Sequence, residues 1–138
     1  MPRIAIIGTG LIGASIGLRM REQSGIKDLE VVGSDISSGH LKRAEKIGAI
    51  DRSVRSPREA VQDASLVVLA TPILPMRALM TEIAPALASG AIVTDTGSTK
   101  AEIMTWAQSE LPRTVSFVGG HPMAGKTESG PAFADIAL

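Results

Sequence analysis

The fold is decided near the amino terminus by the stretch Ile4-Ala5-Ile6-Ile7-Gly8-Thr9-Gly10-Leu11-Ile12-Gly13. A short apolar run passes directly into the pattern Gly-x-Gly-x-x-Gly, and a segment with helical spacing follows. In such a strand-turn-helix unit the first glycine makes a tight turn, the second lets a pyrophosphate approach the backbone, and the third lets helix and strand pack closely. We therefore predict that Gly8, Gly10, Leu11, Ile12 and Gly13 bind a dinucleotide. A turn formed only for packing is the alternative.

The rest of the chain repeats this alternation of short apolar runs and longer helical segments. Strands are expected over residues 4–7, 30–33, 66–70, 91–94 and 115–118, with a weaker one near residues 53–54. Helices are expected between Gly13 and Gly25, from Ser37 or Ser38 to Gly48, after a capping box at Ser56-Pro57-Arg58-Glu59, and over residues 75–84 and 99–111. The alternation predicts an α/β fold, a doubly wound parallel sheet of the Rossmann type. The continuous apolar runs predict strands covered by helices on both faces.

Length and composition restrict the class of protein. The 138 residues are enough for one domain with a substantial core. Fourteen basic and fourteen acidic side chains balance without a basic block, which favours a small-molecule ligand over nucleic acid or an anionic membrane. The absence of cysteine excludes disulfides and thiolate metal sites and fits a reducing compartment, so we expect a cytoplasmic protein. The apolar run at the amino terminus is much shorter than the roughly 20 residues of a membrane span.

Three further loops follow expected strands, at the edge where open α/β sheets bind ligands. Asp35 comes after the second strand, somewhat further from the glycine motif than the usual spacing of about 20 residues for the acid that binds ribose hydroxyls. A carboxylate there favours NAD over NADP, although nearby serine and basic residues keep NADP possible. A strand-end or capping aspartate is the alternative. Thr71 and Pro72, and the loop from Asp95 to Lys100, are expected to line the same cleft.

One histidine is a candidate proton acceptor. His121 lies in Gly119-Gly120-His121-Pro122-Met123-Ala124-Gly125, after the last expected strand. An imidazole with an ordinary pKa of about 6.5 is partly neutral at physiological pH. It can therefore take the proton of a hydroxyl group while a hydride leaves the carbon that bears this hydroxyl. His40, among polar residues, is interpreted as a surface side chain. Ser98 is a candidate helix cap that could also bind substrate or imidazole, and Lys100 receives no catalytic role.

Three motifs together resemble the prephenate and arogenate dehydrogenases of tyrosine biosynthesis. They are Gly8 to Ser15, Asp95 to Lys100 and, most specifically, Gly120-His121-Pro122-Met123-Ala124-Gly125. The resemblance implies an oxidoreductase that uses NAD(P) to decarboxylate prephenate or arogenate oxidatively, giving 4-hydroxyphenylpyruvate or tyrosine. It also implies that His121 and Ser98 are the catalytic positions and that no metal is required.

The resemblance implies an organisation as well. Members of the family carry a second, helical domain that forms a homodimer and contacts the substrate carboxylates. We therefore expect residues 1–138 to be a dinucleotide-binding domain that stops before such a region and binds cofactor with little turnover by itself. Two alternatives are another hydroxy-acid or imino-acid dehydrogenase and a non-catalytic nucleotide-sensing module.

Overall fold

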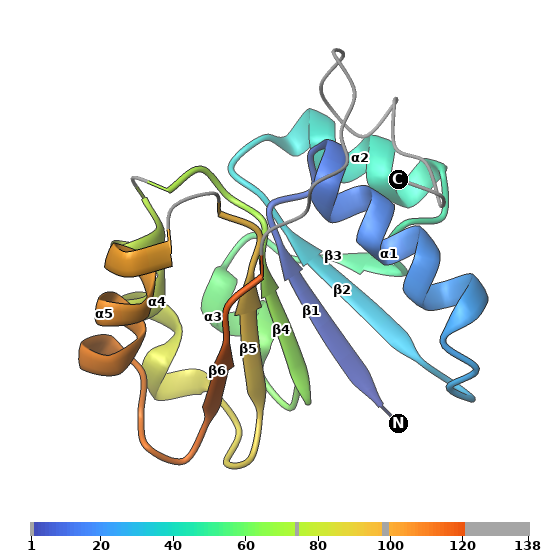
Figure 1. Cartoon of the computed structure of the whole chain (residues 1–138). Coiled ribbons are helices and arrows are strands. Elements are labelled where there is room, and N and C mark those ends of the chain that lie inside the picture. The colour runs from blue at the N-terminus through green and yellow to red at the C-terminus, as the bar shows by residue number, and fades with distance from the viewer. Residues whose placement is uncertain (1, 74, 98–99, 121–138) are drawn as a thin grey trace.

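The protein forms one parallel sheet with its strands in the order β3-β2-β1-β4-β5-β6 (Figure 1). The structure is a computed structural model, and it describes residues 2–73, 75–97 and 100–120. The strands are β1 (Arg3–Ile7), β2 (Glu30–Ser34), β3 (Arg52–Ser53), β4 (Leu66–Leu69), β5 (Ile92–Asp95) and β6 (Ser116–Val118). Strands β1 to β3 follow one another in one direction across the sheet, and β4 to β6 follow one another in the other direction. The two halves of the sheet therefore meet between β1 and β4. The predicted doubly wound fold is confirmed.

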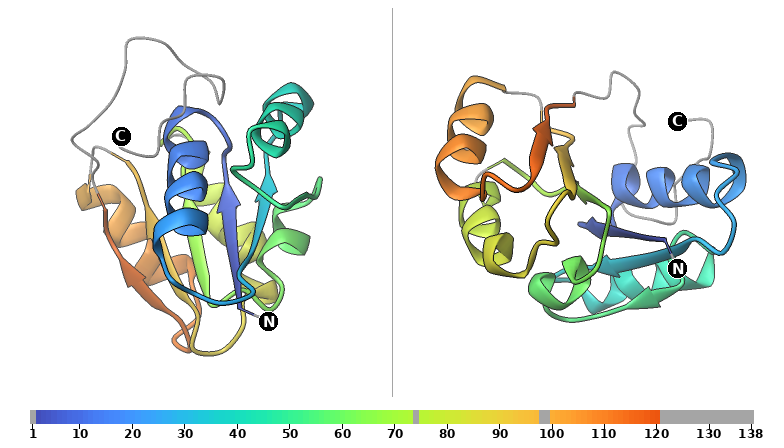
Figure 2. Two further views of the ribbon diagram at one scale, coloured as in Figure 1. Left: turned by 90° about the vertical axis from the view of Figure 1, so that its right-hand side faces the viewer. Right: turned by 90° about the horizontal axis from the view of Figure 1, so that it is seen from below.

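Helices lie on both faces of this sheet, with a different set of helices on each face. They are α1 (Leu11–Gln23), α2 (Ser38–Lys46), α3 (Pro57–Val61), α4 (Met76–Ile83) with the 3-10 turn Ala84–Ala86, and α5 (Lys100–Glu110). Helices α1 and α2 lie on one face, and α3, α4 and α5 lie on the other (Figures 1 and 2). Within the described ranges, no helix is long and apolar enough to cross a bilayer.

The central strand β1 shows why its sequence is apolar at every position. Ala5 and Ile7 pack against the side of α3 to α5, whereas Ile4 and Ile6 pack against the side of α1 and α2. Successive side chains of a strand point to opposite faces, so both sets are buried only if both faces are covered. All four are at most 3% exposed, as the continuous apolar run predicted.

The second half of the sheet departs from this prediction. Val93 is fully buried under α4 and α5, but Ile92 and Val118 are 43% and 57% exposed. The reason is that α1 and α2 lie over β1, β2 and β3, and the described residues place no helix on that side of β5 and β6. The apolar run at β5 therefore has one covered face.

Helix ends agree with most of the sequence signals. The hydroxyl of Ser37 accepts the N–H of His40 and caps α2, and Gly25 and Gly48 follow their helices with left-handed φ angles of +71° and +82°. The helix start predicted at Ser56-Pro57 is confirmed, with Ser56 at the N-cap and Pro57 in the first turn of α3. The capping-box hydrogen bond is wrong, because the Ser56 side chain makes no cap hydrogen bond.

Two glycines of α1 set how closely this helix approaches the sheet. A Cβ atom at Gly13 would overlap the carbonyl oxygen of Gly8, and one at Gly17 would overlap that of Ala49. At Gly10, by contrast, no atom of the described residues lies within 4 Å of the place a Cβ would take. The third glycine of the motif is therefore required by packing, and the second is not.

We expect Gly13→Ala to destabilise the fold and Gly10→Ala to leave it nearly unchanged. The added methyl at position 13 forces α1 away from β1 and should lower the free energy of unfolding by about 1–3 kcal/mol. Position 10 has a φ angle of −75°, which alanine adopts, and the cost there should be about 0.5 kcal/mol or less. Urea unfolding of the two variants measures the difference, and equal losses would contradict this assignment.

Candidate functional site

The glycine turn lies at the carboxyl ends of three neighbouring strands. Gly8 follows β1 with a left-handed φ of +99°, and its N–H donates to the carbonyl of Ser34 at the end of β2. A Cβ at Gly8 would lie 2.5 Å from the carbonyl oxygen of Ala70, just after β4. Only glycine permits this conformation and this approach. The turn is thereby fixed where the two halves of the sheet meet, which is where such sheets bind ligands.

The amino end of α1 provides free hydrogen-bond donors at this point. The first intrahelical bond runs from the N–H of Ala14 to the carbonyl of Gly10, so the amides of Leu11, Ile12 and Gly13 precede the helical ladder. The N-cap residue is Gly10, which has no side chain to cap the helix, and the first turn contains no acidic residue. Together with the open space at Gly10, these amides and the helix dipole form a cradle suited to a phosphate group.

Asp35 connects this cradle to the end of β2. One carboxylate oxygen, Oδ2, accepts the N–H of Thr9 at 2.7 Å and the Thr9 hydroxyl at 3.1 Å. The other, Oδ1, accepts the N–H of Ser37 at 2.8 Å. The side chain is only 10% exposed. Asp35 is therefore a candidate for binding the cofactor, and it also holds the glycine turn in place through Thr9. The sequence did not predict this contact between Asp35 and Thr9.

The surroundings of Asp35 complete one side of the site. Nδ1 of His40 lies 3.6 Å from the Asp35 carboxylate, so His40 is closer to the site than its polar sequence context indicated. Ile36 is fully exposed, an apolar side chain left open beside the acid. On the other side, Thr71 is partly buried and Pro72 is exposed, directly after the residue that contacts Gly8. The structure thus brings Asp35, Thr71 and Pro72 to the same edge as the glycine turn.

A second carboxylate, this one fully buried, lies at the end of β5. The side chain of Asp95 is 0% exposed and pairs with the ammonium of Lys100, at the start of α5. Its Oδ2 also accepts the N–H of Gly97 at 2.8 Å, and its Oδ1 accepts the N–H of Gly120 at 3.1 Å. Sequence reasoning placed Asp95 in the cleft but assigned it no function. The one sequence signal for a role of Asp95 is that an acidic residue ends an otherwise apolar strand.

The two predicted catalytic residues, Ser98 and His121, lie outside the described residues. The structure does describe the residues immediately before them, Gly97 and Gly120, which both donate to Asp95. Their catalytic roles stay predictions.

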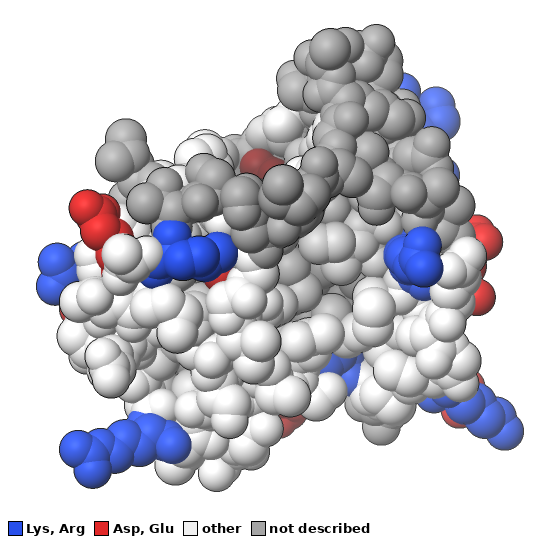
Figure 3. Space-filling view, viewed as in Figure 1, with Lys and Arg blue, Asp and Glu red and all other residues white. Residues whose placement is uncertain are grey.

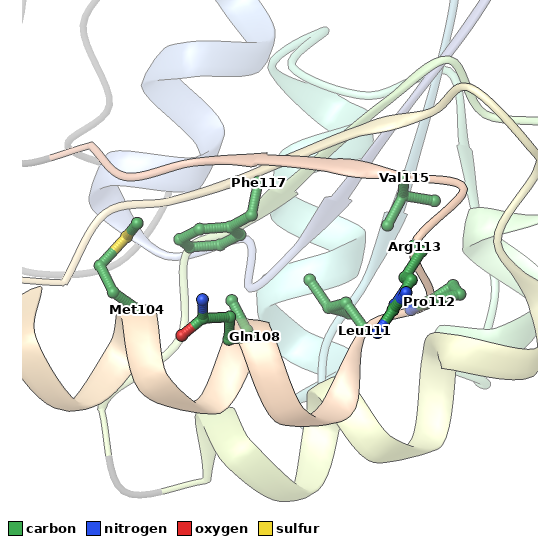
Figure 4. Close-up of a pocket in the computed structure, with 8 residues that line it drawn as sticks. Met104, Gln108, Leu111, Pro112, Arg113, Val115 and Phe117 are labelled. Atoms are coloured by element: carbon green, nitrogen blue, oxygen red, sulfur yellow. The ribbon is translucent and has the colours of Figure 1, made fainter.

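Other surface features do not belong to this site. A groove of about 340 Å³ lies between α5 and β6, lined by Met104, Ala107, Gln108, Leu111, Pro112, Arg113, Val115 and Phe117 (Figure 4). It shares no residue with the glycine turn or Asp35. On the face seen in Figure 3, basic side chains lie apart from one another. No cluster of three or more potential metal ligands occurs in the part of the chain that the structure describes.

Comparison with known proteins agrees with this geometry. Residues 16–138 match the family described as prephenate dehydrogenase, nucleotide-binding domain. The chain is 41% identical over 140 residues to prephenate dehydrogenase of Lactococcus lactis subsp. cremoris (strain MG1363), an alignment that covers 100% of this chain and 38% of that protein.

Two solved structures are similar over nearly the whole chain. A prephenate dehydrogenase from A. aeolicus, in complex with hydroxyphenyl propionate and NAD+, superposes with a TM-score of 0.86 at 29% identity, covering 99% of this chain and 46% of that one. Synechocystis arogenate dehydrogenase gives 0.84 at 28% identity, covering 96% and 45%. The chain thus spans less than half the length of each of these three relatives. It belongs to the family of prephenate dehydrogenase nucleotide-binding domains.

Proposed function

We propose that this chain binds NAD and supplies the cofactor half of an enzyme that oxidatively decarboxylates prephenate or arogenate. The observation that carries the proposal is the cradle at the amino end of α1. There the uncapped amides of Leu11, Ile12 and Gly13 face the open space at Gly10, in a chain of this family. The similar A. aeolicus enzyme is a complex with NAD+, which supports the choice of cofactor.

Asp35 supports NAD in preference to NADP. A nearly buried carboxylate at the end of β2 can accept hydrogen bonds from ribose hydroxyls and repels a 2′-phosphate. Its oxygens already accept from Thr9 and Ser37, so its position is fixed before any ligand arrives. The exposed side chain of Ile36 offers an apolar surface that an adenine ring would cover.

The proposed chemistry divides between cofactor and protein. When bound, NAD supplies the acceptor for the hydride that leaves the hydroxyl-bearing carbon of the ring. The neutral imidazole of His121 accepts the hydroxyl proton, and the hydroxyl of Ser98 orients the substrate hydroxyl or the imidazole. Loss of carbon dioxide then makes the ring aromatic, and the ring oxygen takes a proton back, giving 4-hydroxyphenylpyruvate from prephenate or tyrosine from arogenate. The protein has to align the two partners and hold one proton in the interval.

The remaining length of the relatives suggests how the full enzyme is organised. We propose that residues 1–138 act with a helical region that binds the substrate carboxylates and joins two copies into a dimer. A small-molecule substrate and a cytoplasmic location fit this role. The isolated chain is then expected to bind cofactor with little turnover.

We expect calorimetric titration of this chain with NAD+ to give a dissociation constant in the micromolar range, and Gly10→Ala to weaken it by at least about tenfold. The methyl group fills the space where a pyrophosphate would meet the backbone. The thermal midpoint of the same variant is the control, since the added methyl contacts no atom in the part of the chain that the structure describes. A folded chain that binds neither NAD+ nor NADP+ at millimolar concentration would refute the proposal.

Replacing Asp35 by asparagine should reduce the preference for NAD+ over NADP+. Loss of the negative charge removes repulsion of the 2′-phosphate, and the ratio of the two dissociation constants should change by about tenfold or more. The matched control is Asp28→Asn, at an exposed position whose φ of +57° asparagine tolerates. An unchanged ratio in Asp35→Asn would mean that this carboxylate does not face the ribose.

For the protein at the full length of its relatives, we expect His121→Asn to lower kcat by about 100-fold or more while leaving NAD+ affinity within about twofold. Activity of the unsubstituted enzyme should fall as the pH drops through the pKa of the His121 imidazole, because the protonated ring cannot accept a proton. Steady-state kinetics across pH measures both effects. Equal turnover in the variant would remove His121 from the mechanism.

A further inference from the structure

We infer that Asp95 is a positioning residue, which fixes the backbone leading into His121 by accepting the N–H of Gly120. The role of His121 rests on the proposed function, but the contact itself does not. Backbone pairing between β5 and β6 ends at Thr94 and Val118. Gly119 and Gly120 therefore lie beyond the ladder, and the carboxylate of Asp95 continues the connection by one more hydrogen bond, at 3.1 Å.

The approach at this point is so close that it requires glycine. A Cβ at Gly120 would lie 2.6 Å from the backbone oxygen of Asp95 and 3.4 Å from the hydroxyl oxygen of Thr94. The Thr94 hydroxyl in turn donates to the carbonyl of Val118 at 2.6 Å. The segment before His121 is thus held against the end of β5 by packing and by two hydrogen bonds.

The other carboxylate oxygen anchors Asp95 itself. Oδ2 accepts the N–H of Gly97 at 2.8 Å and pairs with the Lys100 ammonium, which ties it to the turn before α5 and to the helix. A Cβ at Gly97 would lie 2.5 Å from Cδ1 of Ile103 and 3.0 Å from this same oxygen. With its side chain 0% exposed and held on both sides, Asp95 has little freedom to move.

Burial alone does not call for an acid here, because Val93, two residues earlier on the same strand face, is fully buried and apolar. An apolar side chain at position 95 would, however, leave the N–H groups of Gly97 and Gly120 without this acceptor. Buried ion pairs are often no more stabilising than apolar side chains of similar volume. An acid with three donors instead fixes one geometry, and the residue that follows Gly120 is the predicted proton acceptor.

The test uses the fact that the chain has only two histidines, His40 and His121. In histidine-labelled protein, we expect Asp95→Asn to shift the ring signals of His121 in the NMR spectrum and to leave those of His40 in place. The asparagine side chain has one acceptor oxygen, and its other polar group is an NH2 donor. Either the N–H of Gly120 or the donors of Gly97 and Lys100 would then face this NH2 group and lose their acceptor.

Asp35→Asn is the reciprocal control, because Asp35 lies 3.6 Å from His40, and it should shift only the His40 signals. Glu102→Gln controls for the loss of charge, since Glu102 is exposed near the same end of α5 and its replacement should shift neither. A folded Asp95→Asn variant with unchanged His121 signals would overturn the inference.

If Asp95→Asn does not fold, the unsubstituted chain still decides. Scalar coupling across the hydrogen bond from the Gly120 amide nitrogen to the Asp95 carboxylate carbon should be detectable, and its absence, with the corresponding Gly97 coupling present, would overturn the inference.

In the full-length enzyme, Asp95→Asn should lower kcat by up to about 100-fold with the KM for NAD+ nearly unchanged. An increase in the KM for NAD+ with kcat unchanged would also contradict a positioning role. Absence of turnover in the unsubstituted enzyme would count against the proposed function, whereas the NMR results would still judge Asp95.

Discussion

The contact between α1 and the end of β1 is the constraint on which the rest of the structure depends. At Gly13 the helix lies against the carbonyl of Gly8 so closely that no side chain fits, and at Gly17 the same holds for Ala49. This approach places the uncapped amides of α1 at the meeting point of the two half-sheets. A cradle for phosphate therefore results from packing, before any ligand is considered.

Two strand-end carboxylates, the partly buried Asp35 and the buried Asp95, hold the loops on either side of β1 and β4. Asp35 after β2 accepts the Thr9 N–H, and Asp95 at the end of β5 accepts those of Gly97 and Gly120. In each case a strand-end acid satisfies backbone donors of a neighbouring loop, which would otherwise be costly to bury. Backbone pairing between the strands has ended at this edge of the sheet. Side chains at the strand ends therefore hold the loops in place.

Local signals in the sequence were enough to predict the doubly wound sheet, the strands, the glycine turn and the position of Asp35. Apolar runs and glycine spacing act within a few residues, so they can be recognised without an alignment. The hydrogen bonds of Thr9 to Asp35 and of Gly120 to Asp95 join residues far apart in the chain, and no local pattern encodes them. The helix start at Ser56 was predicted correctly, but its side chain makes no cap hydrogen bond. The one-sided burial of β5 depends on which helices lie over it, which periodicity alone does not specify.

The distribution of charge around the cradle follows from how each acid is paired. Lys100 neutralises Asp95, so the β5 side of the cleft carries no net charge from this pair. Among the described residues, Asp35 accepts from the N–H groups of Thr9 and Ser37 and from the Thr9 hydroxyl, and Nδ1 of His40 lies 3.6 Å from its carboxylate. Its negative charge is therefore retained on the β2 side, where it favours hydroxyl donors over a further phosphate. The positive end of the α1 dipole lies between the two acids. Along this edge of the sheet, the charged acid comes first, the helix amides follow, and the neutral Asp95–Lys100 pair comes last. This arrangement complements a ligand that has ribose hydroxyls at one end and phosphates in its middle.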